Sequence, residues 1–140
     1  MKQDIIISLK GSQDDDNKQD EIELITQGTY YSEGESHIIT YDETEVTGFE
    51  GTTTTLKIED NRVTLLRSGQ NNSQLIFEKG QRHLCSYETP FGAFTIGIMS
   101  KNLDIDLSED SGVISAQYQI ELNNNVSGMN NFHLHFRSVV

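Results

Sequence analysis

Cysteine, proline, tryptophan and long hydrophobic runs are scarce or absent in this 140-residue sequence, and each absence excludes a class of protein. The single Cys85 cannot close an intramolecular disulfide, and without a second cysteine it is typical of a small buried hydrophobe rather than a nucleophile. With one proline and 34 % hydrophobic residues, the chain has the composition of a folded protein. Its length predicts a single domain over residues 1–140.

No apolar run approaches the length of a membrane span. The longest runs lie at residues 5–7 and 96–99, far short of what a bilayer needs. Asp4 interrupts the stretch near the start that could serve as the core of a signal peptide. We therefore expect a soluble, cytoplasmic protein.

Basic residues are also scarce, with 10 lysines and arginines against 22 acids. Residues 1–50 hold 13 of the acids and 3 of the bases, so most of the negative charge belongs to one end of the chain. Such a surface repels phosphate, which disfavours nucleic acid and anionic membranes as partners. A basic protein, a cation or a neutral small molecule remains open. The simplest interpretation of the acids at 14–16 is a solvated loop.

Helical spacing of apolar residues is rare, and period-two alternation takes its place. The alternation predicts strands at residues 5–10, 21–31, 37–41, 52–58, 62–67, 74–79, 83–89, 91–99, 103–107, 112–122 and 126–137. Turn-forming residues separate them, as at Ser32-Glu33-Gly34, Lys101-Asn102 and Asn123-Asn124-Asn125. Short turns join neighbouring strands, so an antiparallel meander is expected.

Alternate residues of these strands assign an inner and an outer face. Phe132, Leu134 and Phe136 share one face, opposite His133 and His135. A sheet of many half-buried strands must protect its edges, and evenly spaced strands favour closure over the stacking of two sheets. The predicted fold class is all-β, an antiparallel up-and-down closed β-barrel of about eight to ten strands.

The connection from Asp42 to Gly51 is longer than a hairpin needs and is rich in carboxylates and glycine. In the strand that follows, Thr52 and Thr54 share a face with Leu56 and Ile58. If that face lies inside the barrel, it gives a lumen with a polar rim and an apolar floor, as small-molecule pockets have. A purely structural interpretation stays open, because threonine forms strands and glycine marks bends.

A second rim is expected at the segment YETPFG, where Pro90 and Gly92 indicate a corner or bulge that turns Tyr87 and Thr89 toward one end. Corner geometry alone would also explain this segment. The predicted ligand-binding residues are Tyr41, Glu43, Glu50, Thr52, Thr54, Arg67, Tyr87 and Thr89.

Patterns that carry catalysis or bind metals are missing. His133 and His135 have the spacing of paired metal ligands, but their apolar neighbours claim the inner face, so both are expected outside unless His37 or His83 completes a site. The acidic runs lack the ligands and the glycine of a calcium loop. No phosphate-binding glycine motif or nucleophile elbow occurs. We predict no catalytic residue, no metal and no cofactor.

Three segments, YDETEVTGFEGTTTTLKI, LLRSGQNNSQLIFEKGQ and YETPFGAFTIGI, resemble the YwiB-like family, also called the domain of unknown function 1934 family. The resemblance extends over residues 20–137. It implies a calycin-like, lipocalin-type closed barrel in Gram-positive bacteria, and it implies no established activity. The Gly-x-Trp signature of lipocalins is absent, as is the Arg-x-Tyr pair that fatty-acid-binding proteins carry near their carboxyl end.

Two functions are therefore open. A non-enzymatic barrel that binds a small, partly apolar molecule predicts an internal cavity. A filled barrel that contacts a basic protein through the acidic residues before position 51 predicts an occluded core and salt-sensitive binding. An enzyme would need a cluster of perturbed titratable groups at a cleft.

Overall fold

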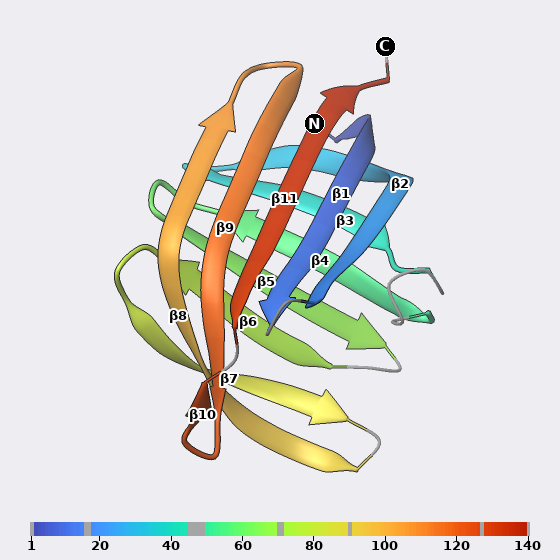
Figure 1. Ribbon diagram of the computed structural model, residues 1–140. Helices are drawn as coiled ribbons and strands as arrows, with labels where there is room; N and C mark the ends of the chain where they lie inside the picture. The colour runs from blue at the N-terminus through green and yellow to red at the C-terminus, as the bar shows by residue number, and fades with distance from the viewer. Residues whose placement is uncertain are drawn as a thin grey trace.

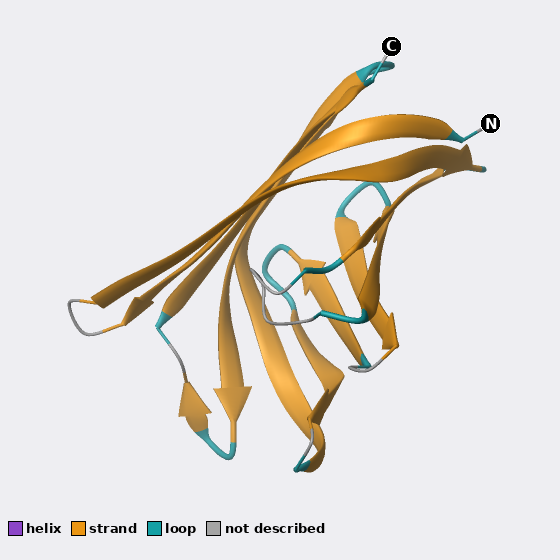
Figure 2. Ribbon diagram, turned by 90° about the vertical axis from the view of Figure 1, so that its right-hand side faces the viewer, coloured by secondary structure: helices purple, strands orange, loops and turns teal. Residues whose placement is uncertain are grey.

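The computed structural model describes residues 2–15, 18–44, 50–69, 72–89, 91–126 and 128–139 (Figure 1). Every regular element within these ranges is a β-strand (Figure 2), and none of the described residues forms a helix long and apolar enough to cross a membrane. The strands are β1 (Gln3–Asp15), β2 (Lys18–Glu33), β3 (Ser36–Asp42), β4 (Thr52–Ile58), β5 (Arg62–Gly69), β6 (Ser73–Glu78), β7 (Arg82–Thr89), β8 (Gly92–Leu107), β9 (Ser111–Leu122), β10 (Asn125–Val126) and β11 (Met129–Ser138).

The strands form one antiparallel sheet that closes into a ten-stranded barrel, with the two-residue β10 beside β9. From β1 to β9 each strand pairs with the next along the chain, and β11 pairs with both β9 and β1. The first and last strands are joined from the pair Ile5–Ser138 to the pair Asp14–Met129. Because the sheet closes on itself, its long edges are paired. The predicted fold class is confirmed.

Strand β8 corrects one feature of the sequence-based prediction. Residues 91–99 and 103–107 were expected to be two strands separated by a turn at Lys101-Asn102, but β8 runs through both. Its register against β9 shifts between Ser100 and Asn102, as in a β-bulge. The turn prediction was wrong because a bulge accommodates an extra residue without ending the strand.

The hairpin between β1 and β2 differs from expectation as well. Asp14 and Asp15 were expected in a loop, yet both belong to β1, and Asp15 pairs with Lys18 of β2. Asp16 lies outside the described residues. Ladder hydrogen bonds join backbone groups, so acidic side chains do not by themselves end a strand.

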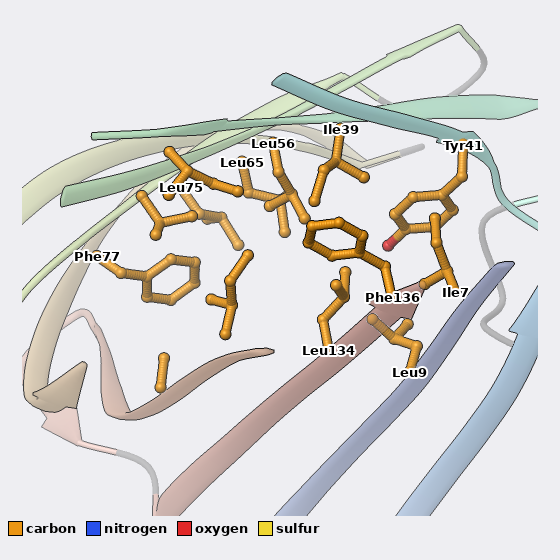
Figure 3. Close-up of a cluster of buried hydrophobic side chains, with 14 of the residues drawn as sticks. Ile7, Leu9, Ile39, Tyr41, Leu56, Leu65, Leu75, Phe77, Leu134 and Phe136 are labelled. Atoms are coloured by element: carbon orange, nitrogen blue, oxygen red, sulfur yellow. The ribbon is translucent and has the colours of Figure 1, made fainter. Parts of the chain in front are cut away.

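The interior of the barrel is filled with apolar side chains along most of its length. Leu56 of β4 lies between Ile39 of β3 and Leu65 of β5, and all three side chains are at most 2 % exposed. Figure 3 shows this wall facing the side chains of β1 and β11 across the interior. The labelled residues of that figure are Ile7, Leu9, Ile39, Tyr41, Leu56, Leu65, Leu75, Phe77, Leu134 and Phe136.

Gly28 of β2 pairs with Tyr41 of β3 at a place where the neighbouring strands pack closely. A Cβ atom at residue 28 would lie 2.6 Å from the carbonyl oxygen of Thr40 and 2.7 Å from Cδ1 of Ile7. Neither distance is compatible with a side chain. The glycine therefore permits the close approach of β1, β2 and β3 at the level of the Tyr41 ring.

Candidate functional site

A row of polar side chains runs round one wall of the barrel interior. Directly opposed residues of neighbouring strands point to the same face of a sheet. The pairs Tyr41–Thr54, Thr54–Arg67, Arg67–Ser73 and Ser73–Tyr87 therefore place five side chains at one level, on five consecutive strands from β3 to β7. Thr54 is fully buried and Tyr41 is 3 % exposed, so the row faces inward.

A second polar row lies on the opposite wall, on β1, β11, β9 and β8. Gln13 of β1 pairs with Asn130 of β11, Asn130 with Tyr118 of β9, and Tyr118 with Ser100 of β8. Asn130 is buried and its side-chain amide donates to the backbone oxygen of Tyr118. Ser100 is fully buried, and its hydroxyl has no hydrogen-bond partner among the described residues. Members of both rows line the end of the barrel that holds Tyr41 and Asn130, which we call the polar end.

The two rows meet around a pocket of about 240 Å³, which we call the polar pocket. Its polar wall combines Tyr41, Glu43 and Arg67 from one side with Tyr118 and Asn130 from the other. The remaining lining residues are Leu9, Gly11, Ser12, Gln13, Ile22, Asn131 and Phe132. The pocket therefore joins charged and hydroxyl groups to an apolar surface, the combination that orients and holds small molecules.

Glu43 is the buried acid of this pocket, with 6 % of its surface exposed. Its backbone nitrogen donates to the carbonyl oxygen of Thr52 at 2.9 Å, which extends the β3–β4 ladder by one step. Its Oε1 atom accepts a hydrogen bond of 2.6 Å from the hydroxyl of Thr54. The ladder and the threonine hydroxyl together fix where the carboxyl group lies.

Burial raises the pKa of Tyr41 above its ordinary value, and the neighbouring Glu43 raises it further by its charge and by hydrogen bonding. The charge of Arg67 and a hydrogen bond with Thr54 act in the opposite direction and do not cancel the shift. Tyr41 therefore stays a neutral hydroxyl beside the acid over the whole physiological range.

Arg67 is the base of the pocket and acts on both walls. Burial raises the pKa of Tyr118, while the charge of Arg67 lowers it and Tyr87 raises it. Arg67 lines the polar pocket together with Tyr41 and Tyr118, and its positive charge lowers the pKa of both phenols. A guanidinium carries five N–H donors, so Arg67 brings several donors to this wall.

The structure brings together most of the residues singled out from the sequence. Tyr41, Glu43 and Arg67 line the polar pocket, and the hydroxyl of Thr54 donates a hydrogen bond to Glu43. Thr52 is 2 % exposed on the same inner face of β4. The expectation that this face lies inside is confirmed, because Leu56 and Ile58 are fully buried on it.

Two of the other predicted residues, Tyr87 and Glu50, are not part of the described lining of the pocket. Tyr87 is half-buried at the far end of the first polar row and borders a separate hollow of about 290 Å³ that Arg67 also lines. Glu50 is exposed in the turn before β4 and is not among the described residues that line the polar pocket. Thr89 ends β7 through its pairing with Gly92, and its side chain lies outside the described part of the structure.

Sequence reasoning missed Gln13, Tyr118 and Asn130, which supply the second wall. A signal was present for two of them. Asn130 is in step with Phe132 and Leu134 on the inner face of β11, and Tyr118 is in step with Ala116 on β9. A polar residue that continues an apolar alternation is a candidate for the lumen, because its side chain points to the same face.

A serine–histidine contact on the outer wall resembles part of a catalytic triad. Ser115 Oγ lies 2.6 Å from His133 Nδ1, above a surface hollow of about 340 Å³ that Asp104 also lines. Asp104 pairs with Ser115 and not with His133, so the acid does not orient the imidazole. His133 and His135 are both exposed, as expected from the alternation, and the contact is explained as a cross-strand hydrogen bond.

Comparisons with known proteins agree with this architecture. The family model described as "Domain of unknown function (DUF1934)" matches residues 7–134. The "Uncharacterized beta-barrel protein YwiB" of Bacillus subtilis (strain 168) is 29 % identical over 133 residues, covering 94 % of this chain and 92 % of that protein. The crystal structure of the ywiB protein from Bacillus subtilis has a TM-score of 0.88 at 24 % identity, covering 99 % of this chain and 94 % of the other. That structural likeness bears on the fold alone.

Proposed function

This chain belongs to the family of the domain of unknown function 1934, and we propose that it binds a small, partly apolar molecule in the polar pocket without transforming it. The observation that carries the proposal is the composition of the pocket wall. Buried Tyr41, Glu43 and Asn130 meet the apolar side chains of Leu9 and Phe132 around one space. Burial of polar groups is costly unless they are hydrogen-bonded, so their concentration around one space favours a binding role over a purely structural one.

The size of the pocket limits the ligand. A volume of 240 Å³ corresponds to about eight groups of water size, at roughly 30 Å³ each. The deeper interior is filled by buried side chains such as Leu134 and Phe136, so a long chain has no room below the pocket. We therefore expect a ligand with a polar head and a short apolar part.

Gly11 offers a direct test, because it lines the pocket and its neighbours leave room for a side chain. A Cβ atom at residue 11 would have one neighbour within 4 Å, the carbonyl oxygen of Asn131 at 3.9 Å. Gly11→Leu should fill the pocket without disturbing the barrel. Titration with 1-hexanol, followed by ¹H–¹⁵N NMR, should shift the signals of Tyr118 and Asn130 in the natural protein and leave them unmoved in Gly11→Leu.

The matched control is Ser68→Leu, which adds the same side chain at an exposed position of β5 outside the pocket lining. It should bind 1-hexanol like the natural protein. Native mass spectrometry of the protein purified from bacterial cells would identify a retained natural ligand. Shifts spread over the outer wall, or equal shifts in Gly11→Leu, would contradict the proposal.

The alternative function is an acidic surface that contacts a basic protein. Exposed acids such as Glu21, Glu23, Glu33 and Glu35 on and beside β2 favour it. Binding of this kind should weaken steeply as salt rises from low to physiological concentration. It should also be insensitive to Gly11→Leu, so the same variant separates the two functions.

A further inference from the structure

We propose that β8 binds an extended segment of a partner protein along residues 102–107, and that this segment alternates basic and apolar residues. The segment extends the sheet as a further strand through backbone hydrogen bonds, a common mode of peptide recognition. None of the residues 102–107 lines the polar pocket, so the inference goes beyond the proposed ligand and does not depend on it. Its acids are also separate from those before position 51.

Closure of the barrel leaves part of β8 with a paired neighbour on one side only. The ladder with β7 ends at Met99, and two backbone hydrogen bonds with the turn before β7 extend it to Ser100. The nearby β6 forms no ladder with β8 and ends at Glu78. On the other side, the ladder with β9 continues to Leu107. Within the part of the chain that the structure describes, residues 102–107 therefore pair with β9 alone, and Figure 1 shows this half of β8 at the margin of the sheet.

The inner side chains of this edge are only partly covered. Leu103, Ile105 and Leu107 pack against the buried core, yet all three are half-buried. Their cross-strand partners on β9 include Ile114 and Ala116, which are at most 3 % exposed. The burial falls from β9 to β8 because a residue on the open edge has a packed neighbour on one side only. An added strand with apolar residues at this level would cover the three side chains and bury apolar area.

The outer side chains select the charge of the partner. Asp104 and Asp106 alternate with the three apolar residues and are exposed. They pair with Ser115 and Val113 of β9, and neither acid forms an ion pair with a residue that the structure describes. Lysine or arginine opposite each acid would give cross-strand pairs of opposite charge, which stabilise a sheet. Alternating acids and apolar residues on β8 therefore fit a partner strand that alternates bases and apolar residues.

The same acids disfavour a second copy of this chain as the partner. In an antiparallel pairing of two β8 edges centred on Ile105, Asp104 of one copy lies opposite Asp106 of the other. Like charges directly opposite each other destabilise a sheet. Charged residues and bulges are common protections of an edge against self-association, and β8 has a bulge between Ser100 and Asn102 beside this stretch. The edge therefore disfavours self-pairing and favours a basic strand.

The test uses the natural protein labelled with ¹⁵N and a capped peptide of alternating lysine and valine, acetyl-KVKVKVK-amide. Titration followed by NMR should shift the amide signals of residues 102–107 and leave those of Gly11 and Tyr41 in the polar pocket unmoved. Bound peptide should also slow hydrogen exchange at the β8 amides that point away from β9. Raising the salt from low to physiological concentration should weaken binding, because exposed charges are screened.

Two control peptides separate strand addition from attraction between charges. The same peptide with every backbone nitrogen methylated keeps its charges and side chains but loses its backbone donors. It should bind at least about tenfold more weakly, because each ladder hydrogen bond contributes to the affinity. The isomer acetyl-KKKKVVV-amide keeps the composition without the alternation and should be similarly weak. These comparisons use the natural protein throughout, so they do not depend on whether a variant folds.

Two variants then assign the charges. Asp104→Asn and Asp106→Asn keep the shape of each side chain and remove one negative charge each. Each should weaken the binding of acetyl-KVKVKVK-amide about threefold, as for an exposed ion pair. The matched control Glu23→Gln removes an exposed acid of β2 and should leave the affinity unchanged.

Each outcome decides for or against strand addition at β8. Shifts confined to residues 102–107 that both control peptides fail to produce would support it. Equal binding of the methylated peptide, shifts centred on the acids of β2, or no shift at all would overturn it. Analytical ultracentrifugation of the natural protein adds one more outcome, since a dimer that the peptide dissociates would overturn the choice of partner. None of these results bears on small-molecule binding in the polar pocket.

Discussion

The two ends of the barrel differ in what they bury. At the polar end, Tyr41, Glu43 and Asn130 are each at most 8 % exposed and border a pocket of about 240 Å³. At the opposite end, which we call the closed end, Phe136 stacks on Tyr30 with ring centroids 5.2 Å apart, and Tyr30 shares a 2.6 Å hydrogen bond with Nδ1 of His37. One end buries charge, and the other buries stacked rings.

The hollow at the closed end is the larger of the two, about 610 Å³, yet it is the weaker candidate for a binding site. Its rim residues Ser32, Glu109 and Asp110 are exposed, so water already satisfies them. Buried polar groups at the polar end are shielded from water, so they need hydrogen-bond partners of fixed geometry. Burial of polar side chains therefore identifies the candidate site better than volume does.

The largest effect that separates the ends should come from the aromatic ring at the closed end. Phe136 is 1 % exposed and stacks on Tyr30, so Phe136→Ala leaves a cavity and should lower the free energy of unfolding by about 3–5 kcal/mol. The matched change at the polar end is Ile22→Ala. Ile22 is 42 % exposed, so its loss should cost less than about 1 kcal/mol.

Urea denaturation of the two variants measures both values. Equal losses would mean that the two ends contribute alike to stability. The contrast in stability between the two ends would then fail.

A buried hydroxyl at the polar end should give the next largest effect. Thr54 is fully buried and donates to Glu43, so Thr54→Val keeps the shape of the side chain and takes one donor away from a buried carboxyl group. We expect a loss of about 1–3 kcal/mol in the free energy of unfolding. Thr55→Val, at the neighbouring half-buried outer position, should change stability by about 0.5 kcal/mol or less. A similar cost at both positions would show that the Glu43 contact contributes nothing.

Alkaline pH should weaken the polar end through Tyr41. Its pKa is raised above the ordinary value of 10.0, mainly by burial, so above pH 10 the unfolded chain loses the phenolic proton while the folded protein keeps it. The contribution is complete below pH 10, and the free energy of unfolding falls as the pH rises further, by up to about 1.4 kcal/mol per pH unit. Tyr41→Phe should flatten this fall in urea titrations from pH 9 to 11. An equally steep fall in the variant would contradict the shift.

Much of the fold could be predicted from the sequence because most strands alternate inner apolar residues with outer polar ones. Strand β4 has the predicted bounds, and its inner face changes from Thr52 and Thr54 to Leu56 and Ile58 as expected. The continuous β8 could not be predicted, because Lys101 and Asn102 have the chemistry of a turn whether the strand ends or bulges. Only the partner strand β9 decides between the two.

About half of the candidate site could be predicted. The other half depends, like the bulge in β8, on the pairing of strands that are distant in the sequence. Tyr41 and Arg67 both pair with Thr54 on the strand between them, and Glu43 follows two residues after Tyr41, so local alternation places the three on one wall. Gln13 and Tyr118 enter the same pocket through the pairing of β1 with β11 and of β11 with β9. That register is set when the barrel closes, and no short window of the sequence contains it.

The smallest predicted effect is the counterpart of Thr54→Val at the closed end. Tyr30→Phe removes the hydroxyl that bonds His37 and keeps the ring that stacks on Phe136. His37 is half-buried and can turn to water, and Ser32 Oγ already lies 3.5 Å from the same nitrogen, so we expect a loss of about 0.5–1.5 kcal/mol. Urea denaturation at pH 8 measures it beside Thr54→Val. A cost in Tyr30→Phe above that of Thr54→Val would reverse the comparison, because the closed end would then depend more on a buried polar contact than the pocket does.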